Sequence, residues 1–194
     1  FKSLTQLTEL YLHNNQIESI DVRLFKTCSN LTELKLQNNK LRKLRPDTFK
    51  SLNILPKLML SNNHIESIDV TAFDGCCKLT ELYLDNNKLT ILEPDTFKLL
   101  TRLEQLDLSN NRINKLNLLF DSVHLEELNF SFNNIEKINL ELTRNYWFKK
   151  INLNISSNDL HQLSDINIIS TEESLFEINA RFNFIQSVPF DEIF

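Results

Sequence analysis

The sequence predicts an α/β solenoid, a curved horseshoe of stacked coils with a parallel β-sheet on its concave face. Three observations predict it. The phrase L-x-x-L-x-L-x-x-N-x-(I/L) recurs about every 24 residues along the chain. Its leucines alternate with polar residues, as in a short strand with one buried face. A column of phenylalanines recurs at the same period between the phrases. Self-similarity at a fixed period indicates a stacked repeat rather than one globular core.

An asparagine closes every copy of the phrase. These residues are Asn15, Asn39, Asn63, Asn87, Asn111, Asn133, Asn158 and Asn183. A buried amide must find hydrogen-bond partners, so we expect these side chains to bond backbone groups of their own and adjacent coils. Tight turns that need a positive φ should also fall largely to asparagine, because the chain contains a single glycine.

The repeats form one array over residues 1–194 without a linker. About eight repeats are expected, starting near residues 7, 31, 55, 79, 103, 125, 150 and 175. Residues 1–48 and 49–96 are identical at most positions, which indicates duplication of a two-repeat unit. Residues 1–4 match 49–52, so we expect the chain to begin inside a repeat. Because solenoids need terminal caps, both ends are expected to be uncapped and the chain to be a fragment of a longer protein.

The segments between strands return the chain over the convex side. Their phenylalanines are expected to stack behind the sheet at Phe25, Phe49, Phe73 and Phe97, with a shift at Phe120. The spacing then loosens, and the convex segments are expected to be mostly irregular. Short helices are expected near Leu140–Phe148 and Asp165–Leu175.

These phrases closely resemble the leucine-rich repeat family, and the resemblance covers nearly the whole chain. The 24-residue length with a phenylalanine in the return path is similar to the typical class of animal extracellular proteins, of Toll-like receptor, Slit and chaoptin type. The resemblance implies a curved solenoid that binds ligands on its concave face, at an extracellular or cell-surface location. A cytoplasmic location stays open. The sequence departs from those proteins in carrying no cysteine-rich capping module.

Composition argues against several other classes. The net charge is -5 and the basic residues are scattered, whereas nucleic-acid binding needs a clustered basic footprint. No apolar run approaches the ~20 residues of a membrane span. One glycine cannot build a phosphate-binding loop.

No candidate catalytic or metal-ligating cluster stands out. The histidines (His13, His64, His124 and His161) are far apart and lack paired-ligand spacing. We expect His13 to be solvated on the strand surface. We therefore expect no enzyme activity, no metal site and no cofactor.

The cysteines are expected to fill the core. Cys28 and Cys76 share a column with Leu4, Leu52 and Leu100. They are two coils apart, or about 9–10 Å, and disulfide Cα separations rarely exceed ~7 Å. We expect no bond between them, and partial exposure for the neighbouring Cys77.

Glycosylation sequons occur at Asn30, Asn129 and Asn154. Their number alone is not evidence, because Asn, Ser and Thr are frequent enough to produce about as many by chance. Their position matters more. Asn129 and Asn154 are expected to face outward from the middle of strands, so glycans there would obstruct the concave face.

The alternation within each strand predicts which side chains face a ligand. Over the first five repeats the outward positions are Glu9, Tyr11, His13, Glu33, Lys35, Gln37, Lys57, Met59, Ser61, Glu81, Tyr83, Asp85, Gln105, Asp107 and Ser109. Acids outnumber lysines among them, and tyrosine and methionine are typical of interfaces. We therefore predict a protein or peptide ligand with a basic patch. The alternative of a face selected only for solubility stays open.

The sequence thus favours a non-catalytic recognition module of a receptor or adhesion protein. Two alternatives are kept, an intracellular scaffold or enzyme regulator built from the same repeats, and a structural spacer without a specific ligand.

Overall fold

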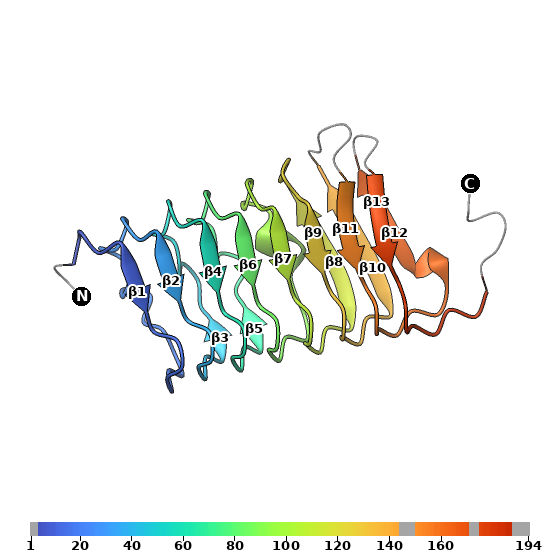
Figure 1. Ribbon diagram of the computed structural model, residues 1–194, viewed down its shortest axis with the longest axis horizontal. Coiled ribbons are helices and arrows are strands. Elements are labelled where there is room, and N and C mark those ends of the chain that lie inside the picture. The colour runs from blue at the N-terminus through green and yellow to red at the C-terminus, as the bar shows by residue number, and fades with distance from the viewer. Residues whose placement is uncertain (1–3, 144–149, 171–174, 188–194) are drawn as a thin grey trace.

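A parallel sheet of short strands runs the length of the molecule. The structure is a computed structural model and describes residues 4–143, 150–170 and 175–187. In spatial order the strands are β1 (Glu9–Tyr11), β2 (Glu33–Lys35), β4 (Lys57–Met59), β6 (Glu81–Tyr83), β7 (Gln105–Asp107), β9 (Glu127–Asn129), β11 (Lys150–Asn154) and β13 (Leu175–Asn179). They follow one another along the long axis, from blue to red in Figure 1. The predicted parallel-strand solenoid is confirmed.

The strands pair in register from coil to coil. Leu34 pairs with Leu58, and Leu58 pairs with Leu82. These central leucines are fully buried, while the residues on either side of each are half-buried on the outward face. The alternation places one leucine column in the core and two columns of variable side chains on the surface. We call that outward surface of the eight-stranded sheet the concave face.

The convex side changes along the chain. In the first coils it is irregular, with one small sheet of β3 (Lys43–Leu44) and β5 (Ser67–Ile68) and a 3-10 turn at Pro94–Phe97. In the later coils a second parallel sheet forms from β8 (Lys115–Phe120), β10 (Lys137–Leu142) and β12 (Ile166–Ser170).

The prediction of two convex helices is wrong for the residues that the structure describes. Residues 140–142 belong to β10, and residues 166–170 form β12, preceded by a 3-10 turn at Leu163–Asp165. The physical reason is a period of two, because β10 buries Ile138, Leu140 and Leu142 and leaves the residues between them half-buried or exposed. Residues 144–148 and 171–174 of the expected helices lie outside the described residues.

A phenylalanine stack fills the core behind the concave sheet, as predicted. The distance between successive ring centroids is 5.9 Å for Phe25 and Phe49 and 5.7 Å for Phe49 and Phe73. It is 6.0 Å for Phe73 and Phe97 and 6.3 Å for Phe97 and Phe120. Phe120 therefore continues the stack despite the shorter spacing in sequence.

All three cysteines are free. Cys28 and Cys76 are buried in the core and Cys77 is exposed, as their repeat column predicts. Burial also raises the pKa of the Cys76 thiol to about 12.

The asparagine ladder holds successive coils together, as predicted. Asn63 Nδ2 donates to the Leu36 carbonyl of the preceding coil at 3.1 Å and to the Leu60 carbonyl of its own coil at 3.0 Å. Its Oδ1 accepts the backbone N–H of Leu41, again in the preceding coil, at 3.1 Å. The same three kinds of bond recur at Asn39, Asn87, Asn111, Asn133, Asn158 and Asn183. Each amide thus satisfies backbone groups that the turn would leave unpaired.

A turn ridge runs beside the ladder, formed by the residue just before each ladder asparagine. These residues have a positive φ: Asn14, Asn38, Asn62, Asn86, Asn110, Phe132, Ser157 and Phe182. Asparagine tolerates this conformation well and a bulky side chain does not. The prediction that asparagine supplies these turns therefore holds for the first five and fails for the last three.

The single glycine has a different role. Gly75 does not have a positive φ, but a Cβ at this position would overlap the backbone carbonyl of Lys50 in the preceding coil. Glycine is required here because two backbones approach closely.

Candidate ligand-binding face

Three columns of side chains cover the concave face. The first is Glu9, Glu33, Lys57, Glu81, Gln105, Glu127, Asn152 and Glu177. The second is Tyr11, Lys35, Met59, Tyr83, Asp107, Asn129, Asn154 and Asn179. The third lies just past the strands and holds His13, Gln37, Ser61, Asp85, Ser109, Ser131, Ser156 and Arg181. The structure therefore brings all the predicted ligand-facing residues onto one surface.

The charged side chains of the first two coils bond one another. Lys35 Nζ lies 2.7 Å from Glu33 Oε1 and 4.7 Å from the centre of the Tyr11 ring. The Tyr11 hydroxyl lies 2.7 Å from the Glu33 carboxylate and 2.8 Å from that of Glu9. The hydrogen bond from Lys35, with that from Tyr11, lowers the pKa of Glu33, and the two carboxylates raise the pKa of the Tyr11 phenol. This group is a pre-formed cluster of two carboxylates, one ammonium and one phenol.

A second cluster of lysine, glutamate and tyrosine lies over β4 and β6. Lys57 Nζ lies 2.6 Å from Glu81 Oε2 and 4.7 Å from the centre of the Tyr83 ring. The Tyr83 hydroxyl donates to Glu81 at 2.8 Å and lies 3.1 Å from Gln105 Oε1. Partial burial, followed by the hydrogen bond to Glu81, raises the pKa of Tyr83 to about 12. The Lys57 ammonium lowers the pKa of Glu81.

An acidic region lies beside the second cluster, over β6, β7 and β9. Asp85 accepts hydrogen bonds from the Ser61 hydroxyl at 2.5 Å and from the Asn86 amide at 2.7 Å. Asp107 accepts the Ser109 N–H at 2.8 Å and the Asn129 amide at 3.2 Å. A small cavity of about 140 Å³ opens between Tyr83, Asp107 and Glu127. These two aspartates are held by neutral donors, so their charge is available to a cationic partner.

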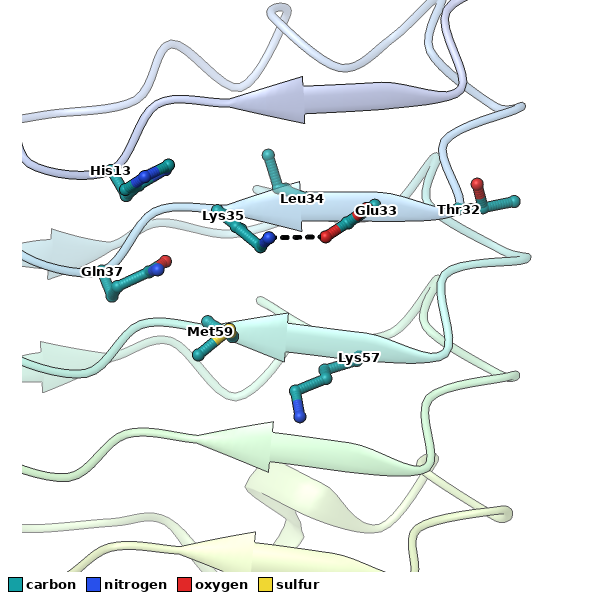
Figure 2. Close-up of a pocket in the computed structure, with 8 residues that line it drawn as sticks. All are labelled: His13, Thr32, Glu33, Leu34, Lys35, Gln37, Lys57 and Met59. Carbon is teal, nitrogen blue, oxygen red and sulfur yellow. Dashed lines mark ion pairs between the residues drawn. The ribbon is translucent and has the colours of Figure 1, made fainter.

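A larger cavity lies over β1, β2 and β4. Its volume is about 520 Å³, and His13, Glu33, Lys35, Gln37, Lys57 and Met59 are among the side chains that line it. Figure 2 shows the His13 and Gln37 side chains extending in the same direction from successive coils, toward the strands. The expectation of a solvated His13 is wrong in part. The residue is half-buried and its Nδ1 atom is shielded from solvent.

The last three coils present neutral amides instead. The Asn129 and Asn154 carboxamides each accept the backbone N–H and the hydroxyl of the serine two residues later, Ser131 and Ser156. Asn179 Nδ2 then donates to Asn154 Oδ1 at 3.2 Å. In these coils the second column and its neighbouring serines form a hydrogen-bonded ladder of small polar groups, beside Glu127 and Glu177 of the first column.

The sequons fall into two settings. Asn30 is exposed on the loop before β2, and its amide donates to the Thr5 carbonyl at 2.8 Å. Asn129 and Asn154 lie at the ends of β9 and β11 on the concave face, half-buried within the amide ladder. A glycan at either of these two would cover part of the concave face.

The sequence analysis did not predict several of the residues on the concave face. Glu127, Asn152, Glu177, Asn179 and Arg181 continue the same columns beyond the fifth repeat. The period-two alternation identifies them as well, but the looser repeat spacing in this part hides it.

Metal and membrane sites were searched for in the described part of the chain. There, no group of three or more His, Cys, Asp or Glu residues is placed to hold a metal ion. Within the same residues no helix is both long and apolar enough to cross a bilayer. What the concave face offers chemically is hydrogen bonds, ionic contacts and aromatic surface.

Fold and surface together define a coil-stacked repeat protein with one extended, side-chain-rich sheet. More specifically, the chain belongs to the leucine-rich repeat family. The model of a family described as "Leucine rich repeat" matches residues 5–65 and 53–113, and a second model of the same description matches residues 124–145. Among curated protein sequences, none matches this chain.

Solved structures share the fold. A leucine-rich repeat domain of APL1B superposes with a TM-score of 0.73 at 22% identity, over 98% of this chain and 62% of that one. The LRIM1/APL1C complex gives a TM-score of 0.69 at 26% identity, over 92% of this chain and 37% of that one. The glycosylated Toll–Spatzle complex, a hub of Drosophila development and innate immunity, gives a TM-score of 0.68 at 26% identity, over 82% of this chain and 26% of that one. This chain therefore spans only part of the proteins that it resembles.

Proposed function

We propose that this chain is a non-catalytic recognition module that binds a protein partner on its concave face. The observation that carries the proposal is the acidic region around Tyr83. There, Asp85 and Asp107 are oriented by neutral hydrogen-bond donors beside a half-buried tyrosine. A partner with a basic patch would gain ionic contacts without breaking an ion pair at these two residues. The carboxylates of Glu33 and Glu81 on the same face differ from these two aspartates, since each is already paired with a lysine.

Two comparisons support a protein as the ligand. Toll is seen in complex with Spatzle, and LRIM1 is seen in complex with APL1C, and both structures share this fold at 26% identity. By the same likeness we infer an extracellular or cell-surface location for this chain. In that setting Asn30 is the sequon that could carry a glycan and leave the concave face open.

The test is partner capture with matched variants. The immobilised chain is used to isolate binding proteins from extracellular fluid of the source organism, and the affinity of a captured partner is measured by surface plasmon resonance. Replacing Tyr83→Ala together with Asp85→Asn should weaken binding roughly tenfold or more, because a central tyrosine and an oriented charge are typical binding hot spots.

The matched control lies on the return path of the same coil. Ile91 and Glu93 are exposed there, so Ile91→Ala with Glu93→Gln removes similar groups from the opposite side and should leave the affinity unchanged. Circular dichroism checks that both variants are folded. Unchanged binding by the Tyr83/Asp85 variant, or an equal loss in the control, would reject the concave-face model.

A further inference from the structure

The cavity over β1, β2 and β4 contains two buried polar atoms without a partner. Among the described residues, His13 Nδ1 and Gln37 Oε1 are the buried side-chain nitrogen and oxygen atoms that make no hydrogen bond. Both line this cavity. Leaving a buried polar atom unpaired costs about 1–3 kcal/mol, and almost all such atoms in folded proteins are paired. Both residues line one cavity, where the donors of a ligand would find unoccupied acceptors.

The charged groups of the cavity are already occupied. Lys35 is paired with Glu33 at 2.7 Å, and Lys57 with Glu81 at 2.6 Å. Each ammonium also lies over a tyrosine ring. An anion or a cation would have to compete with one of these pairs. A neutral group would not, and it would find the imidazole of His13 and the carboxamide of Gln37 free to bond.

Spacing narrows the chemistry of that neutral group. His13 and Gln37 are one coil apart in the third column, and adjacent parallel strands are about 4.7–4.9 Å apart. The two N–H bonds of one primary carboxamide diverge by about 120°, so acceptors about 2.9 Å from its nitrogen lie about 5 Å apart. With the imidazole proton on Nε2, both His13 Nδ1 and Gln37 Oε1 are acceptors.

We propose that this cavity receives the carboxamide side chain of an asparagine or glutamine from the protein partner. His13 and Gln37 accept its two N–H bonds, and Met59 provides an apolar wall. Both acceptors are now shielded, but the terminal torsions of histidine and glutamine rotate broadly, and no side-chain hydrogen bond of either residue is broken when it turns toward the ligand. The proposal rests on the proposed function, since it assigns an anchor point on the same concave face.

The chain carries its own reporter for this cavity. Met59 is the only methionine, so protein labelled with ¹³C at the methionine methyl gives one NMR signal from the cavity wall. The probes are small analogues of side chains. Propionamide represents glutamine, N,N-dimethylpropionamide lacks both N–H donors, and propylguanidinium and propionate represent arginine and glutamate. Maltose represents a carbohydrate ligand.

Propionamide should shift the Met59 signal saturably and bind roughly threefold to tenfold more tightly than its dimethyl analogue, the loss expected for one to two hydrogen bonds. Gln37→Leu should abolish that preference. Ser109→Ala, in the same column but outside the cavity, should preserve it. If Gln37→Leu does not fold, His13→Phe replaces it as the variant.

Equal affinity for the two amides would overturn the proposal, as would no saturable shift with any probe. A preference for propylguanidinium, propionate or maltose would overturn it too, in favour of a cation, an anion or a carbohydrate. Tyr83 and Asp85 do not line this cavity, so a failure here leaves partner binding over β6 to β9 standing. Failure of partner capture, in turn, does not alter the probe measurement.

Discussion

The coils up to Ile113 and the coils after it have the same interior and different exteriors. Asn63 in the first region and Asn158 in the second make equivalent bonds, each to one carbonyl of the preceding coil and one of its own, at 3.0–3.1 Å. On the concave face the first region carries charged and aromatic clusters, and the second carries an amide and serine ladder. The convex side changes from mostly irregular segments to a three-stranded sheet.

Comparing the two regions distinguishes the residues that the fold requires from those that can vary. Every coil must supply buried leucines and a ladder asparagine, because these groups contact the next coil directly. Surface columns have no such requirement, since their side chains point away from the stack. A candidate binding region is therefore best sought where the surface columns differ between otherwise equivalent coils.

The strongest test of the shared interior is to remove a ladder asparagine from each region. Asn87→Ala and Asn158→Ala should each lower the free energy of unfolding by about 3 kcal/mol, because each leaves several buried backbone groups unpaired. Asn87 Oδ1 accepts the N–H of Ile65 at 2.9 Å, and Asn158 Oδ1 that of Ile135 at 3.0 Å. Urea denaturation followed by circular dichroism measures both.

Asn152→Ala is the control for that pair, because Asn152 is exposed on β11. It should change the unfolding free energy by less than about 0.5 kcal/mol. A cost at Asn158 as small as that of the control would mean that the two regions do not share one interior after all.

A smaller effect is expected on the turn ridge. Phe132 has φ 55° and is 58% exposed, whereas Asn86 occupies the equivalent turn with φ 54°. Phe132→Asn should stabilise the protein by about 1 kcal/mol, and Asn86→Phe should destabilise it by a similar amount, because asparagine adopts this conformation more easily. Thermal unfolding of the two variants gives the sign. Destabilisation by Phe132→Asn would show that packing of the ring outweighs its backbone strain.

The smallest effect concerns the charged clusters of the first region. The pKa of Tyr83 is raised to about 12 from an ordinary value of 10. Between these two values the unfolded chain loses the phenol proton and the folded chain keeps it, so stability falls as pH rises from 10 to 12. The free energy of unfolding should therefore decline less steeply over this range in Tyr83→Phe than in the unaltered protein. Parallel declines would contradict the raised pKa.

Much of the fold could be predicted because its determinants are local and periodic. The leucine and asparagine columns predict the strands, the ladder and the surface columns, and the phenylalanine column predicts the aromatic stack. The expected helix at Leu140 is wrong because a strand there depends on pairing with β8, whose residues are 22 positions earlier at Leu118. Regular spacing had already loosened at that point.

The candidate site could be predicted only as a set of positions. Alternation places Tyr11, Glu33 and Lys35 on one face, but not the contacts among them, which depend on cross-strand register and on side-chain torsions. The roles of these residues in ligand binding stay predictions.

The ladder asparagines bind carbonyl and N–H groups of the main chain, and these groups are the same in every amino acid but proline. A coil can therefore be copied, lengthened or exchanged without matching its side chains at the ladder to those of its neighbour. The duplication indicated by residues 1–48 and 49–96, which are identical at most positions, is consistent with that freedom. Another is practical, since coils with chosen surface columns could be inserted into this chain as interchangeable modules, provided that each keeps its own asparagine.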